Sequence, residues 1–284
     1  MCLGAKDYCG IQFAAIREVA ELPFFCRFSP LLPRFPMKTF SQQTANTSPK
    51  SAVRAQVKLS GDTTPSGSEE LELSAQLYWD LFYEKQKNQS PPSQFAAFVA
   101  SEFKSHPLFI DIGCGNGRDT LFFSYLGHNV IGIDKSSSAI DFCKAQIISD
   151  DQKLSTFLNA DVSELDTKDP LFTQVSSRKK LIYSRFFLHA IQEQKEDELF
   201  EFIVKICKHP EDVIALEFRT EEDAHNPKLA QAHFRRFIST KRLQDKLENK
   251  FKLNVNYQVQ GYGLAKYGSE DAHVCRMILS KSTQ

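Results

Sequence analysis

The residues best suited to chemistry lie in residues 108–120, where an apolar run ends in Asp111 and three glycines follow at every second position. The apolar run has the length of a buried strand, and an amphipathic segment beginning near Asp119 indicates a helix. Glycine allows positive φ and lets a bulky ligand approach the main chain without Cβ contacts. The pattern therefore predicts a strand, a ligand-binding turn and a helix, with the turn built on Gly113, Gly115 and Gly117.

The spacing of the glycines limits the kind of ligand. A dinucleotide turn has the pattern Gly-x-Gly-x-x-Gly, in which a pyrophosphate lies on the helix N-terminus. Here the third glycine comes one position early and Arg118 stands in its expected place. The carboxylate of Asp111 would also repel a phosphate, whereas it would attract the ammonium of an amino-acid-like ligand. S-adenosylmethionine carries that ammonium and no phosphate.

The segment resembles the first motif of the class I S-adenosylmethionine-dependent methyltransferases, here Asp111-Ile112-Gly113-Cys114-Gly115-Asn116-Gly117. The resemblance implies an α/β fold, a Rossmann-like seven-stranded sheet that is mostly parallel, with helices on both faces and an antiparallel terminal hairpin. It implies S-adenosyl-L-methionine as the cofactor. It also implies that this segment binds it, through Asp111, Gly113, Cys114, Gly115 and Gly117.

Two helices should precede the first strand, because apolar residues recur at helical spacing on each side of Pro91-Pro92. The first of them carries Tyr78, Trp79 and Tyr83, and it resembles the N-terminal helical lid of small-molecule methyltransferases. Aromatic faces attract a sulfonium much as they attract an ammonium. Any one of these rings could instead pack against the core. Trp79 is the preferred cofactor contact.

Ligands of open α/β sheets bind at the carboxyl ends of the strands, so the strand ends supply the other candidates. Asp134 ends the second predicted strand 21 residues beyond Gly113, where an acid can accept from a ribose diol. After the third strand, Asp161 and Val162 resemble the adenine-edge motif of the family. After the fourth, the family places residues near the transferring methyl. The remaining predicted cofactor contacts are Lys135, Ser184 and Arg185.

Cationic and titratable residues gather after the fourth and fifth strands, namely Arg185, His189, Glu217, Arg219, His225, His233, Arg235 and Arg236. Arginines suit an acceptor that bears a carboxylate or phosphate, and a histidine near neutrality suits proton removal from a hydroxyl or amine. The predicted catalytic residues are Arg185, Arg219, His189 and His233, the last as the preferred base. The irregular stretch after Thr220 is a plausible acceptor-recognition loop.

Each member of this cluster also has a structural interpretation. Arg219 and Glu217 have the same parity on the fifth strand, so they could pair with each other. His189 and Arg185 could be partners at a helix start. Arg235 and Arg236 could lie on a solvated face.

The elements that must position these residues follow from apolar periodicity. Beyond the first strand, strands are predicted at residues 129–133, 153–158, 180–184, 213–218, 252–260 and 275–280, and helices at residues 136–148, 193–208 and 237–249. A capping box from Ser138 to Asp141 is expected in the first of these helices. Strands that alternate with helices require a parallel sheet with right-handed crossovers. The last two strands, joined without a helix, should form an antiparallel hairpin at one edge.

Composition limits the class of protein. The chain has 284 residues, 42% of them hydrophobic and 25% charged, with a formal net charge of zero and a pI near 7.0. A neutral chain lacks the basic field that drives non-specific binding to nucleic acid or to anionic membranes. The seven cysteines show no Cys-x-x-Cys pair and no zinc-site spacing, which indicates free thiols and a cytoplasmic protein. No apolar run reaches the ~18 residues of a membrane helix, and no metal site is predicted.

The domain organisation is predicted in two parts. Residues 1–69 should be an N-terminal extension that is largely disordered, since residues 38–70 are rich in Ser, Thr, Gln and Lys. Translation from Met37 instead of Met1 is an alternative. Residues 70–284 should form the methyltransferase domain, with a helical lid at residues 70–106 and the sheet core at residues 107–284.

The predicted function is transfer of a methyl group from S-adenosylmethionine to a heteroatom of a small acceptor that is anionic or polar. One alternative is an RNA or protein methyltransferase that uses the locally basic face at residues 228–252. Another is a module that binds the cofactor without catalysis, and a nicotinamide-dependent oxidoreductase comes third. The identity of the acceptor and the oligomeric state do not follow from the sequence.

Overall fold

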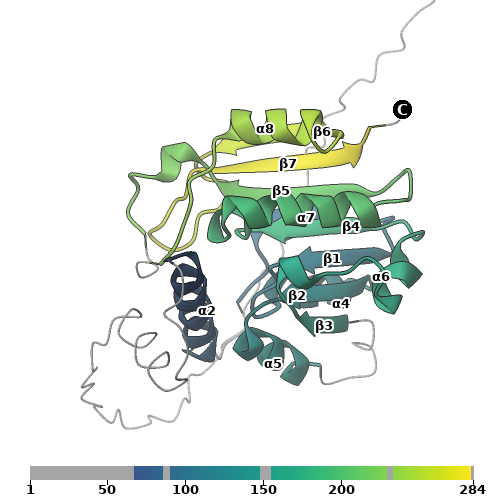
Figure 1. The fold of residues 1–284 in the computed structure, drawn as a ribbon, viewed down its shortest axis with the longest axis horizontal. Helices are drawn as coiled ribbons and strands as arrows, with labels where there is room; N and C mark the ends of the chain where they lie inside the picture. Colours follow the sequence, from purple (N-terminus) through teal and green to yellow (C-terminus); the bar gives the residue numbers. More distant parts are fainter. Residues whose placement is uncertain (1–66, 86–89, 148–154, 229–232, 283–284) are drawn as a thin grey trace, which may run out of the picture. The chain divides into compact units, whose positions relative to one another are not determined.

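Seven strands form one sheet in the order β3-β2-β1-β4-β5-β7-β6 (Figure 1). Strands β3, β2, β1, β4 and β5 are parallel, and β7 is antiparallel to both of its neighbours. The predicted fold class, including the antiparallel hairpin at one edge, is confirmed. The strands are β1 (Leu108–Ile112), β2 (Asn129–Asp134), β3 (Ser155–Asn159), β4 (Leu181–Arg185), β5 (Val213–Arg219), β6 (Leu253–Gly261) and β7 (Val274–Lys281).

This computed structural model describes residues 67–85, 90–147, 155–228 and 233–282, all of which belong to one compact unit. The predicted extension at residues 1–69 therefore lies outside the described residues up to residue 66. The first two residues predicted for the third strand, 153 and 154, also lie outside them. No helix in the described ranges combines the length and the apolar character needed to cross a membrane.

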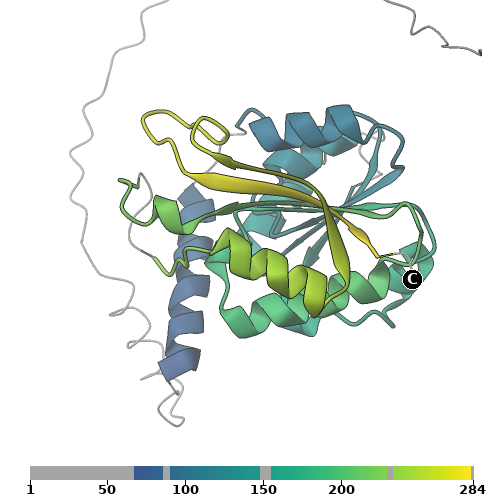
Figure 2. The same cartoon turned by 90° about the horizontal axis from the view of Figure 1, so that it is seen from above.

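Helices cover both faces of the sheet. Figure 2 shows α7 and α8 on one side of the sheet and α3 and α4 on the other. The helices are α2 (Gly67–Lys85), α3 (Gln94–Glu102), α4 (Arg118–Tyr125), α5 (Ser137–Ala145), α6 (Pro170–Val175), α7 (Glu193–Ile206) and α8 (Thr240–Asn249), with 3-10 turns η2 (Val162–Glu164), η3 (Leu188–Ala190) and η4 (Glu221–Asp223). The sequence did not predict α6 or the 3-10 turns, because each is too short to show a period.

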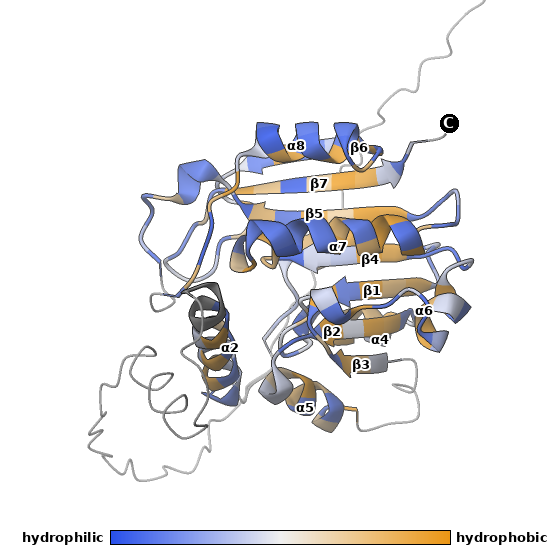
Figure 3. Ribbon diagram, in the orientation of Figure 1, coloured by the Kyte–Doolittle hydropathy of each residue, from blue (hydrophilic) through white to orange (hydrophobic). Residues whose placement is uncertain are grey.

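The alternation of side chains along each strand gives two apolar layers. Ile110 and Ile112 of β1 pack in the cluster that contains the buried faces of α7 and α8, whereas Phe109 packs with Phe95 of α3 and Phe123 of α4. Figure 3 shows the strands as mainly hydrophobic and the outer faces of α7 and α8 as hydrophilic. The central sheet is therefore buried on both sides, as its mostly parallel order requires.

Two predicted helix starts differ from the structure. The N-cap of α5 is Ser136, whose Oγ accepts a hydrogen bond from the Ala139 N–H at 3.2 Å, so the capping box expected from Ser138 is wrong. The extended backbone of Ser136 makes it the better cap, and Ser138 lies inside the helix. The helix predicted from residue 237 begins at Thr240, because Ile238 is extended and its N–H donates to the Arg219 carbonyl.

Candidate active site

The glycine turn after β1 has the backbone that the sequence predicts. Gly113, Gly115 and Gly117 have φ values of 77°, 54° and 73°. The N–H groups of Gly113 and Cys114 both donate to the Ile133 carbonyl, at 2.8 and 3.0 Å, which ties the turn to the end of β2. A Cβ on Gly113 would overlap the ring of Phe187. Glycine is thus required here by both conformation and space.

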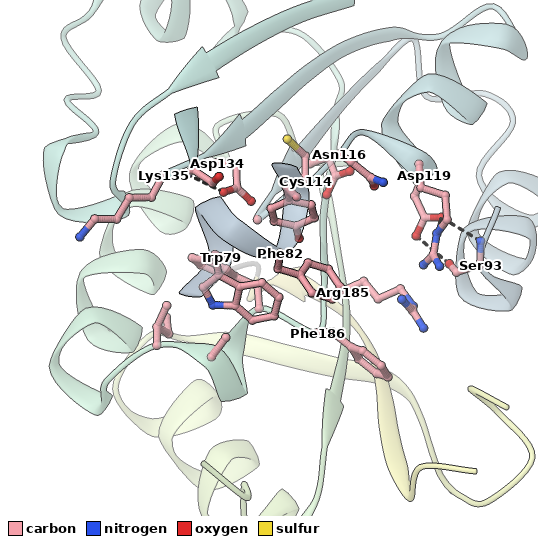
Figure 4. Close-up of a pocket in the computed structure, with 18 of the residues that line it drawn as sticks. Trp79, Phe82, Ser93, Cys114, Asn116, Asp119, Asp134, Lys135, Arg185 and Phe186 are labelled. Atoms are coloured by element: carbon pink, nitrogen blue, oxygen red, sulfur yellow. Dashed lines mark hydrogen bonds and ion pairs between the residues drawn. The ribbon is translucent and has the colours of Figure 1, made fainter. Parts of the chain in front are cut away.

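A cavity of about 700 Å³ opens at the carboxyl ends of the parallel strands and is partly covered by α2. That volume is typical of a pocket for a small organic ligand. Figure 4 shows Trp79 and Phe82 in the middle of it, with Asp134 to one side and Arg185 to the other. The predicted site residues on its wall are Trp79, Asp111, Gly113, Cys114, Asp134, Lys135, Asp161, Arg185 and Arg219.

Asp111 is the acid at the head of the glycine turn and is only 3% exposed. The hydroxyl of Thr120 donates to its Oδ2 at 2.5 Å. Burial raises the pKa of Asp111 to about 8, against the opposing effect of that hydrogen bond. An ammonium in the cavity would favour the ionised carboxylate, so Asp111 suits a cationic ligand.

Asp134, at the end of β2, accepts two backbone hydrogen bonds. The Gly115 N–H donates to Oδ2 and the Ser136 N–H donates to Oδ1, each at 2.8 Å. Burial raises the pKa of Asp134, and these bonds oppose the rise. Because each carboxylate oxygen keeps a second lone pair, both can still accept from the hydroxyls of a ribose.

Asp161 is held by two lysines from different elements. The Nζ atoms of Lys195 and Lys135 lie 2.7 and 3.0 Å from its Oδ2. Although burial alone would raise it, these ammonium groups and the hydrogen bonds from Ser163 hold the pKa of Asp161 well below its usual range. Val162 lies on the wall of a smaller adjoining cavity of about 50 Å³, which shares Gly113 and Asp134 with the main one.

Arg185 and Arg219 both reach the cavity but have different partners. Arg185 Nε donates to Glu217 at 2.7 Å, and the other oxygen of Glu217 accepts from Arg276. Arg219 pairs with Asp223 at 2.6 Å and with Glu270. The alternative in which Arg219 pairs with Glu217 is therefore wrong, because each finds its partners on other elements.

Five of the predicted site residues lie off the walls of both cavities. Gly115 faces the Tyr83 hydroxyl and Gly117 faces the Cys143 sulfur. The Ser184 hydroxyl is buried and donates to the Ile112 carbonyl at 2.9 Å. The remaining two are His189 and His233.

The two histidines lie in different surroundings. His189 is 4% exposed, its Nδ1 accepts the Arg219 N–H at 3.3 Å, and burial and the nearby Arg219 hold its pKa well below the usual value. His233 is partly exposed and stacks on Tyr78, with ring centroids 4.4 Å apart. Its ring also lies 5.1 Å from that of Trp79, which does line the cavity. His233 is thus the closer of the two to solvent and to the lid.

The sequence missed several residues of the wall. Phe186 and Phe187 follow β4 directly, and their position at a strand end was a usable signal. Lys195 is the third residue of α7 and had no local signal in the sequence. Arg236, for which a solvated face was one interpretation, instead donates to Glu196 at 2.6 Å and to the Ile191 carbonyl at 2.7 Å.

Comparison with known proteins agrees with this geometry. Residues 109–209 match the family model described as a methyltransferase domain. This segment is therefore similar to the methyltransferase-domain family, and the strand order and the glycine turn agree with that match. The prediction of a methyltransferase domain is confirmed for this segment.

Individual relatives of the chain are distant. Protein 235L of Invertebrate iridescent virus 6, described as a methyltransferase, is 29% identical over 119 residues, which are 37% of this chain and 45% of the viral protein. The chain thus spans less than half the length of that relative. A methyltransferase from Anabaena variabilis has a TM-score of 0.53 at 18% identity, covering 73% of this chain and 93% of its own. The glycopeptide N-methyltransferase MtfA, solved with S-adenosyl-L-methionine, has a TM-score of 0.53 at 14% identity, covering 68% and 95%. These two structures show a shared fold.

Proposed function

We propose that this protein transfers the methyl group of S-adenosylmethionine to a heteroatom of a small acceptor that is anionic or polar. One observation carries the proposal. A single cavity is lined both by acids suited to the cofactor and by arginines suited to the acceptor. Its wall contains the acids Asp111 and Asp134, which flank the glycine turn, and also the arginines Arg185 and Arg219.

The residues present fit the cofactor. Asp111 would hold its ammonium, Asp134 its ribose hydroxyls, and Asp161 with the Val162 N–H its adenine edge. The bound cofactor supplies an already activated methyl group. The protein therefore acts chiefly by holding the acceptor in line with that methyl, an effect worth up to ~7–11 kcal/mol. The aromatic residues of α2, among them Trp79, would exclude water.

An acceptor hydroxyl or amine would also have to lose a proton. We propose His233 as the base, because it is partly exposed and contacts the lid residues Tyr78 and Trp79. His189 is the weaker candidate, since its ring is buried and its Nδ1 accepts a backbone N–H. We assign Arg185 and Arg219 to the acceptor, and Lys135, Cys114 and Ser184 to the cofactor side of the site.

Calorimetric titration of the full chain tests the cofactor half of the proposal. S-adenosylmethionine should bind, and NAD and NADP should not. Asp111→Ala and Asp134→Ala should each weaken binding by at least tenfold. Binding of NAD, or equal binding by the variants, would contradict the proposed cofactor site.

Transfer of a labelled methyl group tests the acceptor half. The protein, radiolabelled S-adenosylmethionine and a cell extract are incubated, and the product is separated by size. We expect the label in the low-molecular-weight fraction. Label in RNA or protein would favour the alternative acceptors, and saturable cofactor binding with no transfer would favour a non-catalytic module.

Three further proposals concern the protein as a whole. Residues 70–284 form the catalytic domain, while the extension predicted at residues 1–69 lies outside the described residues up to residue 66. The location is cytoplasmic, which is supported by the free thiols of the four described cysteines, Cys114, Cys143, Cys207 and Cys275. The partner is a small-molecule acceptor, and neither nucleic acid nor a membrane.

A further inference from the structure

Glu217 is a carboxylate, 1% exposed, at the centre of an ionic triad that we define as Arg185, Glu217 and Arg276. Its Oε1 accepts from Arg185 Nε and its Oε2 accepts from Arg276 Nε, both at 2.7 Å. Arg276 also donates to the Leu264 carbonyl and lies over the ring of Phe95, 5.2 Å from its centroid. Two guanidinium groups thus share one carboxylate, and the triad carries a net charge of +1.

The charges around the triad do not cancel this excess. Arg118 and Asp119 form a pair of their own at 3.1 Å. Arg219 and Lys228 balance Asp223 and Glu270. Two further cations add to the excess: Lys266, exposed on the cavity wall, and Arg235, hydrogen-bonded to His233.

Arg185 presents the excess charge to the cavity. Its Nε is used by Glu217, but its η nitrogens have no hydrogen-bond partner within the part of the chain that the structure describes. Its side chain keeps 16% of its surface exposed, and it lies on the cavity wall. A half-buried guanidinium with one edge held and the other open is suited to bind an anion from the cavity.

Phe186 fixes the Arg185 side chain from the other side. Its ring centroid lies 4.1 Å from the Arg185 guanidinium and 5.1 Å from that of Arg219 (Figure 4). Phe186 has a φ of +58°, which is uncommon for a bulky residue. Its N–H donates to the Glu217 carbonyl at 2.8 Å, so the same residue of β5 holds both Phe186 and Arg185.

We propose that the methyl acceptor carries a carboxylate, that the free η N–H groups of Arg185 bind it, and that Glu217 and Phe186 are positioning residues for this guanidinium. The inference rests on the proposed function and names its substrate class. A carboxylate suits the site because it is planar and matches the two parallel N–H groups of one guanidinium edge.

The test uses the full chain saturated with S-adenosylhomocysteine, the product form of the cofactor, so that no transfer occurs. Three carboxylates and their amides are titrated calorimetrically: acetate and acetamide, benzoate and benzamide, phenylacetate and phenylacetamide. At least one carboxylate should bind tenfold or more tightly than its amide. If S-adenosylhomocysteine itself does not bind, the proposed function is wrong. If it binds but no carboxylate is preferred, only the present inference is wrong.

Three variants test whether the preference for carboxylates depends on Arg185. Arg185→Gln should abolish the preference for a carboxylate over its amide. Arg185→Lys should retain less than a third of this preference, because an ammonium keeps the charge but lacks the two parallel N–H groups of a guanidinium. Lys241→Gln removes an exposed positive charge that lies on neither cavity wall and should leave the preference unchanged. Affinity for S-adenosylhomocysteine checks in each case that the site is folded.

Glu217→Gln separates positioning from charge. The substitution raises the net charge of the triad by one, so a purely electrostatic role predicts tighter carboxylate binding. Positioning predicts the opposite, a loss of at least fivefold. Tighter binding in Glu217→Gln, or a preference that survives Arg185→Gln, overturns the assignment. Tenfold tighter binding of phenyl phosphate than of benzoate also overturns it, in favour of a phosphate-bearing acceptor.

Discussion

Asp111 is a carboxylic acid in the interior, and its ionisation opposes folding. Burial raises its pKa to about 8 in the folded chain, whereas an unfolded aspartic acid has a pKa of ~3.9. Between these values the folded state keeps a proton that the unfolded state has lost. The stability that Asp111 contributes is therefore complete below pH ~4 and falls as the pH rises toward 8, by up to ~1.4 kcal/mol per pH unit.

The substitution Asp111→Asn should remove this dependence. We expect the ligand-free variant to gain stability relative to the wild type as the pH is raised from 5.5 to 8. The measurement is the free energy of unfolding in urea for both proteins at both pH values. Asp134 also has a raised pKa, but it is present in both proteins and cancels in the difference. If the free energies of unfolding of the variant and the wild type differ by the same amount at the two pH values, Asp111 is ionised in the folded state.

Lys180 and Asp212 form an ion pair that is buried at 0% and 3% exposure. The Nζ atom lies 2.8 Å from Oδ2 and also donates to the Ser176 carbonyl at 2.9 Å. Lys180→Met leaves Asp212 charged in the interior, so the free energy of unfolding should fall by ~3–5 kcal/mol.

Two controls accompany this prediction. The double change Lys180→Met with Asp212→Leu should recover part of the loss, because no buried charge remains. Lys241→Met breaks an exposed pair with Asp245 and should not change stability measurably. Unfolding of the variants in denaturant measures these changes in the free energy of unfolding. A loss below ~1 kcal/mol for Lys180→Met would mean that water reaches the ion pair.

Residue types at strand ends could be predicted, but their tertiary partners could not. Asp111 and Asp134 were found because each follows an apolar run at a fixed distance from the glycines. Lys195 binds Asp161 across 34 positions in sequence, and Glu270 binds Arg219 across 51. Such pairs are set by the packing of distant elements, which leaves no local pattern in the sequence.

The two N-terminal helices have different relations to the core. Phe95 of α3 is 0% exposed and stacks on Tyr183, with ring centroids 5.2 Å apart. Trp79 of α2 is only partly buried and lines the cavity. Phe95→Ala should therefore lower the free energy of unfolding by ~3–5 kcal/mol. Trp79→Ala should change stability little and weaken S-adenosylmethionine binding by at least fivefold.

Thermal unfolding and calorimetric titration of both variants separate the two roles. Phe98→Ala, on α3 but partly exposed, is the matched control for Phe95. A large loss of stability in Trp79→Ala with unchanged cofactor affinity would assign α2 to the core instead of the lid.

The elements themselves were largely predictable. Strand and helix periods located seven strands and the longer helices to within a few residues, because the buried faces of this sheet are continuous apolar runs. The placement of β7 between β5 and β6 was not predicted, since a hairpin read from sequence alone could add either strand to the edge. The short helix α6 has fewer than two turns and no readable period.

At the scale of the whole molecule, charge is balanced overall and also locally on α8. The chain has 35 basic and 35 acidic residues. Lys246 lies 2.8 Å from Glu196 and 2.7 Å from Asp197, and Lys250 lies 3.0 Å from Asp197. Lysines already paired in this way are poor ligands for phosphates, which weakens the alternative of an RNA substrate bound by residues 228–252.

We therefore expect no saturable binding of a fluorescent 20-nucleotide RNA at 150 mM salt, with only weak binding at 20 mM salt. Fluorescence anisotropy across a salt series makes the measurement. If the logarithm of the RNA association constant falls steeply and linearly with the logarithm of the salt concentration, the protein neutralises several phosphates on binding. That result would restore the RNA alternative. Lys246→Glu should have no effect on the weak binding if α8 is not the contact surface.

The order of strands across the sheet also bears on how the protein is made. β7 is the last of the described strands in the chain, yet it lies between β5 and β6 in space. During synthesis the apolar edge of β5 therefore stays open until residue 281 has left the ribosome. An open edge of this kind can pair with a neighbouring chain. A nascent polypeptide of this protein thus exposes an unpaired strand edge for longer than one whose sheet grows outward in sequence order.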